Sequence, residues 1–302
     1  MRIQGLYEMS ARAGKMSPLV YKAGKLLVNS LYPRLAKPQW GLDEESPVLI
    51  SLTSFPARIH TLWITINTLL NQTVKPAGIL LWLAEDQFPG GLEDLPKRLR
   101  DLQAYGLTIR FCENIYPHKK YYYTMRENPD KAVITVDDDM FYPENLVEEL
   151  VALNRRFPDC VCCTWAHRIT RRGSEVAPYR EWEHCTMTGG EPSRSLLPVG
   201  CGGVLYPPRA LCPDVFDIDK INKLCLRADD LWLKSMAALA GTKAVRWEKK
   251  TPIFFSIVDA QSSGLYHENL ERDRNDAAMR AIMDVYPTLY ELLNDDTEPE
   301  KK

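Results

Sequence analysis

Residues 132–139 read Ala-Val-Ile-Thr-Val-Asp-Asp-Asp, and this stretch decides the fold prediction. Its apolar, β-branched half is typical of a buried strand, and the three aspartates stand at the carboxyl end of that strand. In open α/β sheets this end faces the crevice where ligands bind. Three adjacent carboxylates repel one another unless water or a divalent cation neutralises them, and Mg²⁺ and Mn²⁺ prefer oxygen ligands. The stretch therefore predicts a metal and nucleotide-diphosphate site, with a solvated acidic loop as the alternative.

Strand and helix patterns alternate around this stretch. Strands joined by short helices form a mostly parallel sheet covered on both faces, because each crossover returns right-handed over the sheet. Residues 168–206 are richer in Gly, Pro and Arg and predict an irregular region over one end of the sheet. The fold class is therefore α/β, with a mostly parallel central sheet flanked by helices. The predicted strands are 48–53, 79–84, 107–112, 132–136 and 161–165, and the predicted helices are 61–72, 96–105, 119–127 and 144–157.

The chain is expected to have three parts. Residues 1–46 form a basic helical extension and linker, residues 47–291 form the main domain, and residues 292–302 form a disordered tail. In the extension, apolar residues recur near helical spacing with lysines between them. This pattern favours either a helix on an anionic membrane surface or a helix packed on its own domain.

Charge is distributed unevenly along the chain. The net charge is −2, but residues 1–38 carry seven basic side chains and one acidic one, so the remainder carries −8. An acidic body of this kind argues against general nucleic-acid binding. The sequence has no apolar run of about 18 residues, so no transmembrane helix is predicted, and it begins without the apolar core of a secretory signal. The eight cysteines lack metal-ligand spacing and predict reduced thiols in the cytoplasm.

Two polar motifs precede the aspartates. Thr53, Ser54 and Arg58 follow the first strand, and their hydroxyls and guanidinium suit a nucleotide and its diphosphate. A helix cap explains the hydroxyls equally well. Lys119 and Lys120, followed by three tyrosines, are candidates for phosphate contact and for stacking on a base or sugar. A solvated helix face with buried tyrosines is the commoner meaning of that pattern.

The aspartates themselves are expected to differ in direction. Side chains alternate along a strand, so Asp137 and Asp139 share one side and Asp138 faces the other. An EF-hand loop is excluded, because Tyr142 stands at the sixth position, where Gly is needed, and because a strand rather than a helix precedes the loop.

Three further features follow the main strand and helix pattern. They are a glycine loop with Gly202 and Gly203, an acidic pair, Asp229 and Asp230, that opens a predicted helix, and His267. Glycines allow a ligand to approach the backbone closely, and a carboxylate at a helix amino terminus can act as a general base toward a hydroxyl. The aspartates also fit helix caps, and a lone His is more often structural.

In their order and approximate spacing, these motifs resemble those of bacterial nucleotide-sugar glycosyltransferases of the GT-A fold. The shared features are an Asp-x-Asp motif after a strand, a glycine loop, an acidic pair that opens a helix and a carboxyl-terminal His, and they span Val48 to His267. The run His-Lys-Lys-Tyr-Tyr-Tyr before Thr-Val-Asp-Asp-Asp is similar to enzymes that build lipopolysaccharide and capsule. The pair here is Asp-Asp where Glu-Asp is commoner, which leaves the role of Asp229 open.

The resemblance implies a role for each matching residue. Asp137 contacts the nucleotide or ribose, Asp139 and His267 hold Mn²⁺ or Mg²⁺ beside the diphosphate, and Asp230 is the catalytic base of an inverting transfer. The role of Asp138 stays open. The remaining residues expected to line the nucleotide-sugar site are Thr53, Ser54, Arg58, Lys119, Lys120, Asp138, Gly202, Gly203 and Asp229.

The resemblance also implies substrates and a setting. A UDP-sugar is the expected donor, and a glycan or glycolipid is the expected acceptor in bacterial surface polysaccharide synthesis. The protein is expected in the cytoplasm, where its amino-terminal helix either lies on the inner face of the membrane or packs on its own domain.

Two other functions stay open. A sugar-phosphate nucleotidyltransferase uses a similar sheet and similar aspartates, but it has a glycine-rich, basic loop after the first strand, where this chain has Thr-Ser-Phe-Pro at 53–56. A non-catalytic nucleotide-sugar-binding protein would bind nucleotide without consuming a donor. The presence of both the candidate metal aspartates and a candidate base argues against the second.

Overall fold

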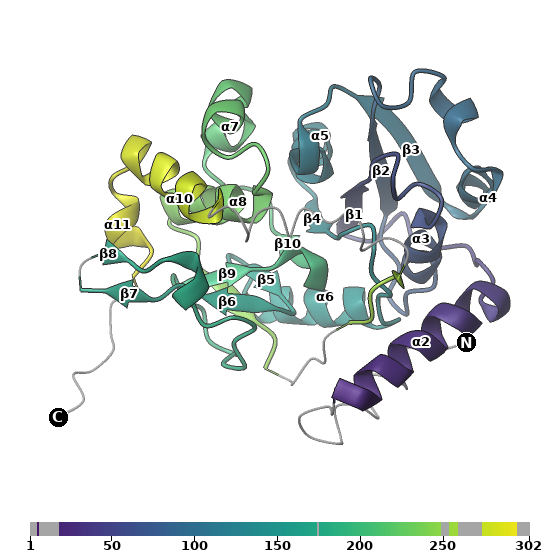
Figure 1. Ribbon diagram of the computed structural model, residues 1–302, viewed down its shortest axis with the longest axis horizontal. Coiled ribbons are helices and arrows are strands. Elements are labelled where there is room, and N and C mark those ends of the chain that lie inside the picture. Colours follow the sequence, from purple (N-terminus) through teal and green to yellow (C-terminus); the bar gives the residue numbers. More distant parts are fainter. Residues whose placement is uncertain (1–4, 6–17, 174, 249–253, 259–273, 295–302) are drawn as a thin grey trace.

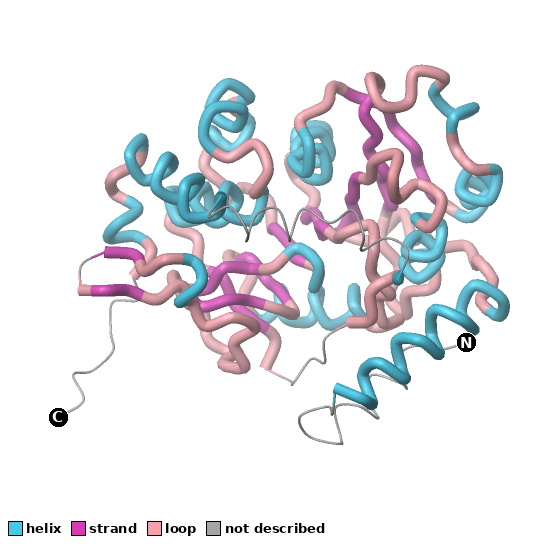
Figure 2. Tube along the Cα trace, viewed as in Figure 1, coloured by secondary structure: helices cyan, strands magenta, loops and turns pink. Residues whose placement is uncertain are grey.

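The computed structural model describes residues 5, 18–173, 175–248, 254–258 and 274–294. Its helices and strands are placed as Figure 1 shows, and Figure 2 distinguishes them from the loops. The helices are α2 Pro18–Leu35, α3 Leu62–Leu70, α4 Lys97–Arg100, α5 Lys119–Glu127, α6 Leu146–Arg156, α7 Ile218–Leu224, α8 Asp229–Leu239, α10 Arg274–Val285 and α11 Leu289–Leu292. No helix in these ranges is both long enough and apolar enough to cross a bilayer.

A seven-stranded sheet forms the centre of the described chain, with the strand order β11-β5-β10-β4-β1-β2-β3. Six strands run parallel, and β10 runs antiparallel between β4 and β5. This confirms the predicted α/β class with a mostly parallel central sheet. The strands are β1 Val48–Thr53, β2 Gly78–Ala84, β3 Leu107–Cys112, β4 Ala132–Thr135, β5 Val161–Cys163, β10 Val204–Tyr206 and β11 Ala244–Arg246.

Helices cover both faces of this sheet. Every residue of β4 is buried, as expected for a strand without a solvent face. Helix α5 packs against β1, β2 and β4, and α6 packs against β5 and β10. Figure 1 shows α5 and α6 on opposite sides of β4 and β10.

The region predicted to be irregular is more ordered than expected. Residues 168–206 contribute β10 to the central sheet, and two small antiparallel sheets form in and beside them. One joins β6 Ala166–Arg168 to β9 Leu196–Pro198, and the other joins β7 Arg171–Arg172 to β8 Glu175–Val176. These strands have two or three residues each, which is too short to produce a period in the sequence.

The strand order reverses direction between β1 and β4. From β1 the chain first builds outward through β2 and β3, and then returns to place β4 on the other side of β1. In a parallel sheet this switch point opens a crevice at the carboxyl ends of the two strands. The segments that follow β1 and β4 are therefore the ones best placed to meet a ligand.

Candidate active site

The aspartate triplet leaves the sheet at this switch point, directly after β4, and the segment 53–58 leaves it after β1. Asp138 turns inward: it is buried, Ser54 Oγ donates to its Oδ2 at 2.6 Å, and Arg58 Nη1 lies 2.5 Å from its Oδ1. Thr65 donates to its backbone carbonyl at 3.0 Å. Asp138 thus ties the two strand ends together, and it uses the hydroxyl of Ser54 to do so.

Asp139 lies on the more open side of the loop but is still largely buried. Arg58 Nη2 reaches its Oδ2 at 3.2 Å, so a single guanidinium joins Asp138 and Asp139. Burial raises the pKa of Asp139 from 3.8 to about 7, and the charges of Asp138 and Asp137 add to this shift while Arg58 opposes it. The loop therefore holds more negative charge than its own cation neutralises.

Asp137 has the most accessible carboxylate of the three, with 33% of its side chain exposed against 6% and 14% for Asp138 and Asp139. Its backbone N–H donates to the hydroxyl oxygen of the buried Tyr142 at 2.8 Å, and this hydrogen bond holds the loop in place. Sequence reasoning gave Tyr142 no part in the site. Its position five residues after Asp137, in a buried run, was the available signal.

Lys120 connects the triplet to the second acidic motif. Its Nζ lies 3.0 Å from Asp137 Oδ1 and 2.7 Å from Asp229 Oδ2, and its side chain is 6% exposed. Burial alone would lower the pKa of Lys120, but the charges of Asp137 and Asp229 outweigh burial and raise it above its usual value. Lys120 is therefore a buried, charged bridge between α5, the β4 loop and α8.

The side chain of Lys119 contacts other partners than the aspartates. Its Nζ donates to Asn114 Oδ1 at 3.1 Å and to the carbonyl oxygen of Tyr116 at 2.9 Å. Burial lowers its pKa to about 8. Thr53 is likewise engaged by the sheet, because its hydroxyl donates to the carbonyl of Trp82 at 2.7 Å. Phosphate contact by Lys119 and nucleotide contact by Thr53 stay predictions.

The acidic pair opens α8 as predicted, since this helix begins at Asp229. The N–H of Gly200 donates to Asp230 Oδ2 at 3.1 Å. The pKa of Asp230 is raised from 3.8 to about 7, chiefly by burial and also by the charge of Asp229, while Lys120 opposes the shift. A carboxylate with a pKa near neutral can accept a proton at physiological pH, which suits a general base.

Gly200 lies where these groups meet. A Cβ added to it would lie 2.9 Å from Lys120 Nζ, 3.0 Å from Asp230 Oδ1 and 3.4 Å from Asp137 Oδ1. By contrast, a Cβ on Gly202 would meet Thr164 and Trp165 within 3 Å, and one on Gly203, at φ +85°, would meet Leu146 at 3.2 Å. Gly200, rather than Gly202 or Gly203, therefore adjoins the carboxylates. Sugar contact by Gly202 and Gly203 stays a prediction.

Gly200→Ala is expected to impair activity while the fold persists. The new methyl group would displace Lys120 or Asp230, but the backbone of Gly200 is not left-handed, so no φ strain is added. We expect kcat to fall at least about tenfold, because a misplacement of 1 Å at a reacting group can cost more than that. Gly78→Ala is the matched control, since its Cβ would meet only the side chains of Leu49 and Leu80. Equal activity in both variants would remove Gly200 from the site.

Asp230→Asn is expected to stabilise the fold at alkaline pH. Because the folded pKa of about 7 lies above the ordinary 3.8, the folded state binds the proton more tightly, and stability falls as pH rises from about 4 to 7. Asn carries no charge, so its advantage is small near pH 4 and complete above pH 7, at roughly 4 kcal/mol. Thermal melts at pH 5 and pH 8 would show a Tm advantage of the variant that is clearly larger at pH 8. An equal Tm difference at both pH values would contradict the shifted pKa.

The carboxylate oxygens of the site are the kind of ligand that a hard divalent cation prefers. Within the described residues, however, the ligand set is incomplete. They contain no cluster of three or more His, Cys, Asp and Glu side chains placed to hold a metal ion, and the predicted ligand His267 lies outside them. The excess negative charge at Asp139 is what such a cation would relieve. Mg²⁺ and related ions often take only one or two carboxylates and complete their shell with water and substrate phosphates.

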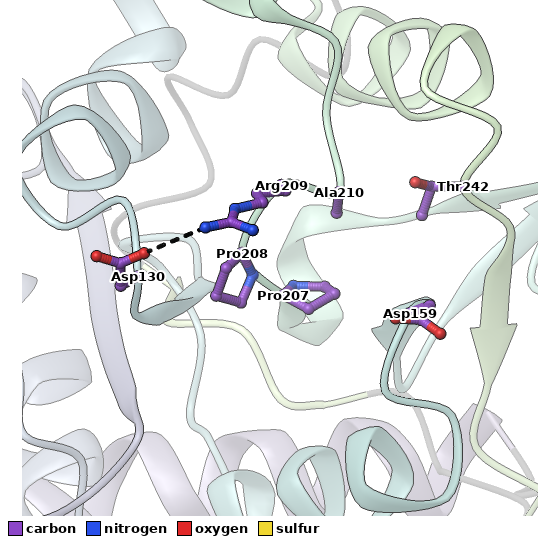
Figure 3. A pocket seen from close by; sticks show the side chains of 7 residues that line it. All are labelled: Asp130, Asp159, Pro207, Pro208, Arg209, Ala210 and Thr242. Atoms are coloured by element: carbon purple, nitrogen blue, oxygen red, sulfur yellow. Dashed lines mark ion pairs between the residues drawn. The ribbon is translucent and has the colours of Figure 1, made fainter.

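A cavity of about 390 Å³ lies at the end of the strands opposite to the aspartate triplet, and Figure 3 shows the residues that line it. Its lining residues precede β4, β5 and β11 or follow the antiparallel β10, so they stand at the ends of the strands remote from Asp137. Arg209 approaches Asp130 there at 3.9 Å, and both side chains are exposed. The cavity is therefore separate from the acidic site. It is lined by Asp130, Asp159, Pro207, Pro208, Arg209, Ala210 and Thr242.

Comparison with known proteins yields structural likeness only. No protein-family model and no curated protein sequence matches the chain. Among solved structures, the chain is similar to the mannosyltransferase PcManGT from Pyrobaculum calidifontis in complex with GDP-Man and Mn²⁺, at 11% identity and a TM-score of 0.47, covering 96% of this chain and 79% of that one. It is also similar to S. aureus TarS 1-349, at 13% identity and a TM-score of 0.44, covering 83% and 66%. Both likenesses concern the course of the backbone alone.

Proposed function

We propose that this protein is a metal-dependent glycosyltransferase that moves a sugar from a nucleotide-diphosphate sugar to a hydroxyl group of a glycan acceptor. The observation that carries the proposal is the bridge made by Lys120, which holds Asp137 at the strand switch and Asp229 at the start of α8 within 3.0 Å of one ammonium group. Asp230 follows Asp229 and, like Asp137, lies within 3.4 Å of the Cβ position of Gly200, so a carboxylate suited to a donor and one suited to an acceptor share one site.

The donor side is built on the segments after β1 and β4. Asp137 has the exposed carboxylate that a ribose hydroxyl can use as an acceptor, and Arg58 and Lys120 supply positive charge beside it. Asp139, with His267 as the expected second ligand, would hold the cation. Bound there, Mg²⁺ or Mn²⁺ would neutralise the charge that grows on the departing diphosphate.

The acceptor side is built on α8. Asp230 would take the proton of the acceptor hydroxyl as that oxygen forms its bond to the anomeric carbon and the bond from that carbon to the diphosphate oxygen breaks. The nucleoside diphosphate leaves with the bonding electrons, and the proton stays on the Asp230 carboxyl. Attack from the face opposite the leaving group inverts the anomeric configuration.

The finer assignments depend on the motifs in the sequence. Residues 118–123 and 135–139 resemble enzymes that build lipopolysaccharide and capsule. This resemblance supports a UDP-sugar donor, a role in bacterial surface polysaccharide synthesis and a cytoplasmic location. The nucleotidyltransferase alternative gains no support from the structure, because the segment after β1 reads Thr-Ser-Phe-Pro at 53–56 and its Ser54 donates to Asp138. That loop offers no glycine-rich cradle for a triphosphate.

A panel of nucleotide sugars tests the proposal. The full chain is incubated with each donor and Mn²⁺, and released nucleoside diphosphate is measured with and without candidate glycan acceptors. We expect one donor to be consumed in preference to the others, and faster with acceptor present. If the chain binds nucleotides but consumes no donor across the panel, the enzymatic proposal is wrong.

A further inference from the structure

Helix α2 has an apolar outward face that its own domain does not cover. The exposed fractions are 65% for Leu26, 47% for Leu27 and 56% for Leu35, and Trp40, just beyond the helix, is 59% exposed. Burying a leucine side chain stabilises a protein by roughly 1.5–3 kcal/mol, so a cluster of exposed leucines on one helix calls for an explanation. In Figure 1, α2 lies at the edge of the molecule, away from α8 and α10.

The segment that forms this face is basic. Between Glu8 and Asp43 the sequence contains six basic residues and no acidic one, although the chain as a whole has a net charge of −2. Of these basic residues, Lys22, Arg34 and Lys37 are exposed around the leucines. Apolar side chains ringed by cations match the interface of an anionic bilayer, where the leucines enter the acyl boundary and the cations meet the headgroups.

The inward face of α2 is fixed to the domain. Val28 and Tyr32 are buried in the main core. Asn29 Nδ2 donates to the carbonyl of Ser256 at 3.1 Å, and the N–H of Val258 donates to Asn29 Oδ1 at 3.0 Å. The helix thus has a satisfied inner face, while its outer leucines stay 47–65% exposed.

We propose that the outward face of α2 docks on an anionic lipid bilayer. The segment that seats α2 also borders the catalytic loop, because Ser256 pairs with Met140 and the N–H of Ile257 donates to the carbonyl of Asp139 at 2.8 Å. A docked α2 is therefore separated from the loop of Asp139 by one strand-like segment. Docking holds the active site close to the bilayer surface, whatever reaction that site performs.

Vesicle sedimentation of the full chain tests this docking. Vesicles of phosphatidylcholine with about 30 mol% phosphatidylglycerol should pellet the protein, and phosphatidylcholine alone should not, because each basic residue near an anionic surface contributes a favourable term. Leu26→Glu with Leu27→Glu should lower the partition coefficient at least about tenfold, since it removes the apolar contact and adds repulsion. Lys22→Gln with Arg34→Gln should weaken binding to the anionic vesicles and should leave the result with neutral vesicles unchanged.

Val285→Glu is the matched control. Val285 is also an exposed apolar residue, at 46%, but it ends α10 at the far side of the molecule, so this variant should sediment like the wild type. Unchanged sedimentation of the Leu26/Leu27 variant would overturn the proposal. So would a wild-type dimer in light scattering that this variant converts to a monomer, because the face would then bind a second copy of the chain. No turnover is measured, so either result leaves the proposed glycosyltransferase function standing.

Discussion

Asp230→Asn is expected to lower the rate of sugar transfer by about 10²- to 10⁴-fold, the usual contribution of a general base. Asn keeps the size of the side chain and can still accept the hydrogen bond from the N–H of Gly200, so the site should keep its shape. It cannot take a proton from the acceptor. Steady-state kinetics should therefore show a loss in kcat, and calorimetry should show nucleotide binding close to that of the wild type.

Two comparisons make this result specific. Asp219→Asn makes the same chemical change at an exposed position on α7 and should leave the rate unchanged. In the wild type, kcat should rise with pH through about 7, the raised pKa of Asp230, because the base is active only when ionised. Turnover of the Asp230→Asn protein within a few-fold of the wild type would exclude this residue as the base.

Asp139→Asn is expected to remove the metal-dependent part of nucleotide binding. Asp139 is the largely buried carboxylate at the strand switch whose pKa burial raises to about 7, so a cation there would relieve an unfavourable charge. Asn lacks that charge, while Arg58 keeps its contact with Asp138. We expect the affinity for nucleoside diphosphate in the presence of Mn²⁺ to fall at least about tenfold, as is usual when metal coordination is disturbed.

Excess chelator should reproduce the effect in the wild type and add little in the variant. Asp101→Asn is the matched control, because Asp101 pairs with Lys97 on the exposed surface beyond α4. If nucleotide binds the wild type equally well with Mn²⁺ and with chelator, the cation has no part in donor binding at this site.

The pattern of the sequence predicted those parts of the fold that have a clear period. Strands β1 and β3 and helix α5 have the predicted bounds, because long apolar runs and amphipathic turns leave a strong signal. The three-residue strand β10 lay inside the stretch expected to be irregular. Its antiparallel pairing with β4 and β5 depends on contacts between residues far apart in the sequence. No local pattern contains that information.

The candidate site shows the same division. Both acidic motifs were found from the sequence, because each follows or begins a regular element. The sequence did not predict that Lys119 and Lys120 differ. Adjacent helix residues point about 100° apart, and only the packing of α5 decides which one faces the carboxylates. Lys120 reaches Asp137 and Asp229, and Lys119 reaches Asn114. The place of Gly200 among these charges likewise arises only when α8 and the β4 loop pack together.

The most direct test of the central claim is the phosphorus product of the reaction, followed by ³¹P nuclear magnetic resonance with Mg²⁺ as the cation, because paramagnetic Mn²⁺ would broaden the signals. The full chain is given either a panel of nucleotide sugars with glycan acceptors or nucleoside triphosphates with sugar phosphates. We expect nucleoside diphosphate to appear from a nucleotide sugar, and to appear at least about 10²-fold more slowly with Asp230→Asn. Pyrophosphate from the second mixture, with no nucleoside diphosphate from the first, would show a nucleotidyltransferase and contradict the account.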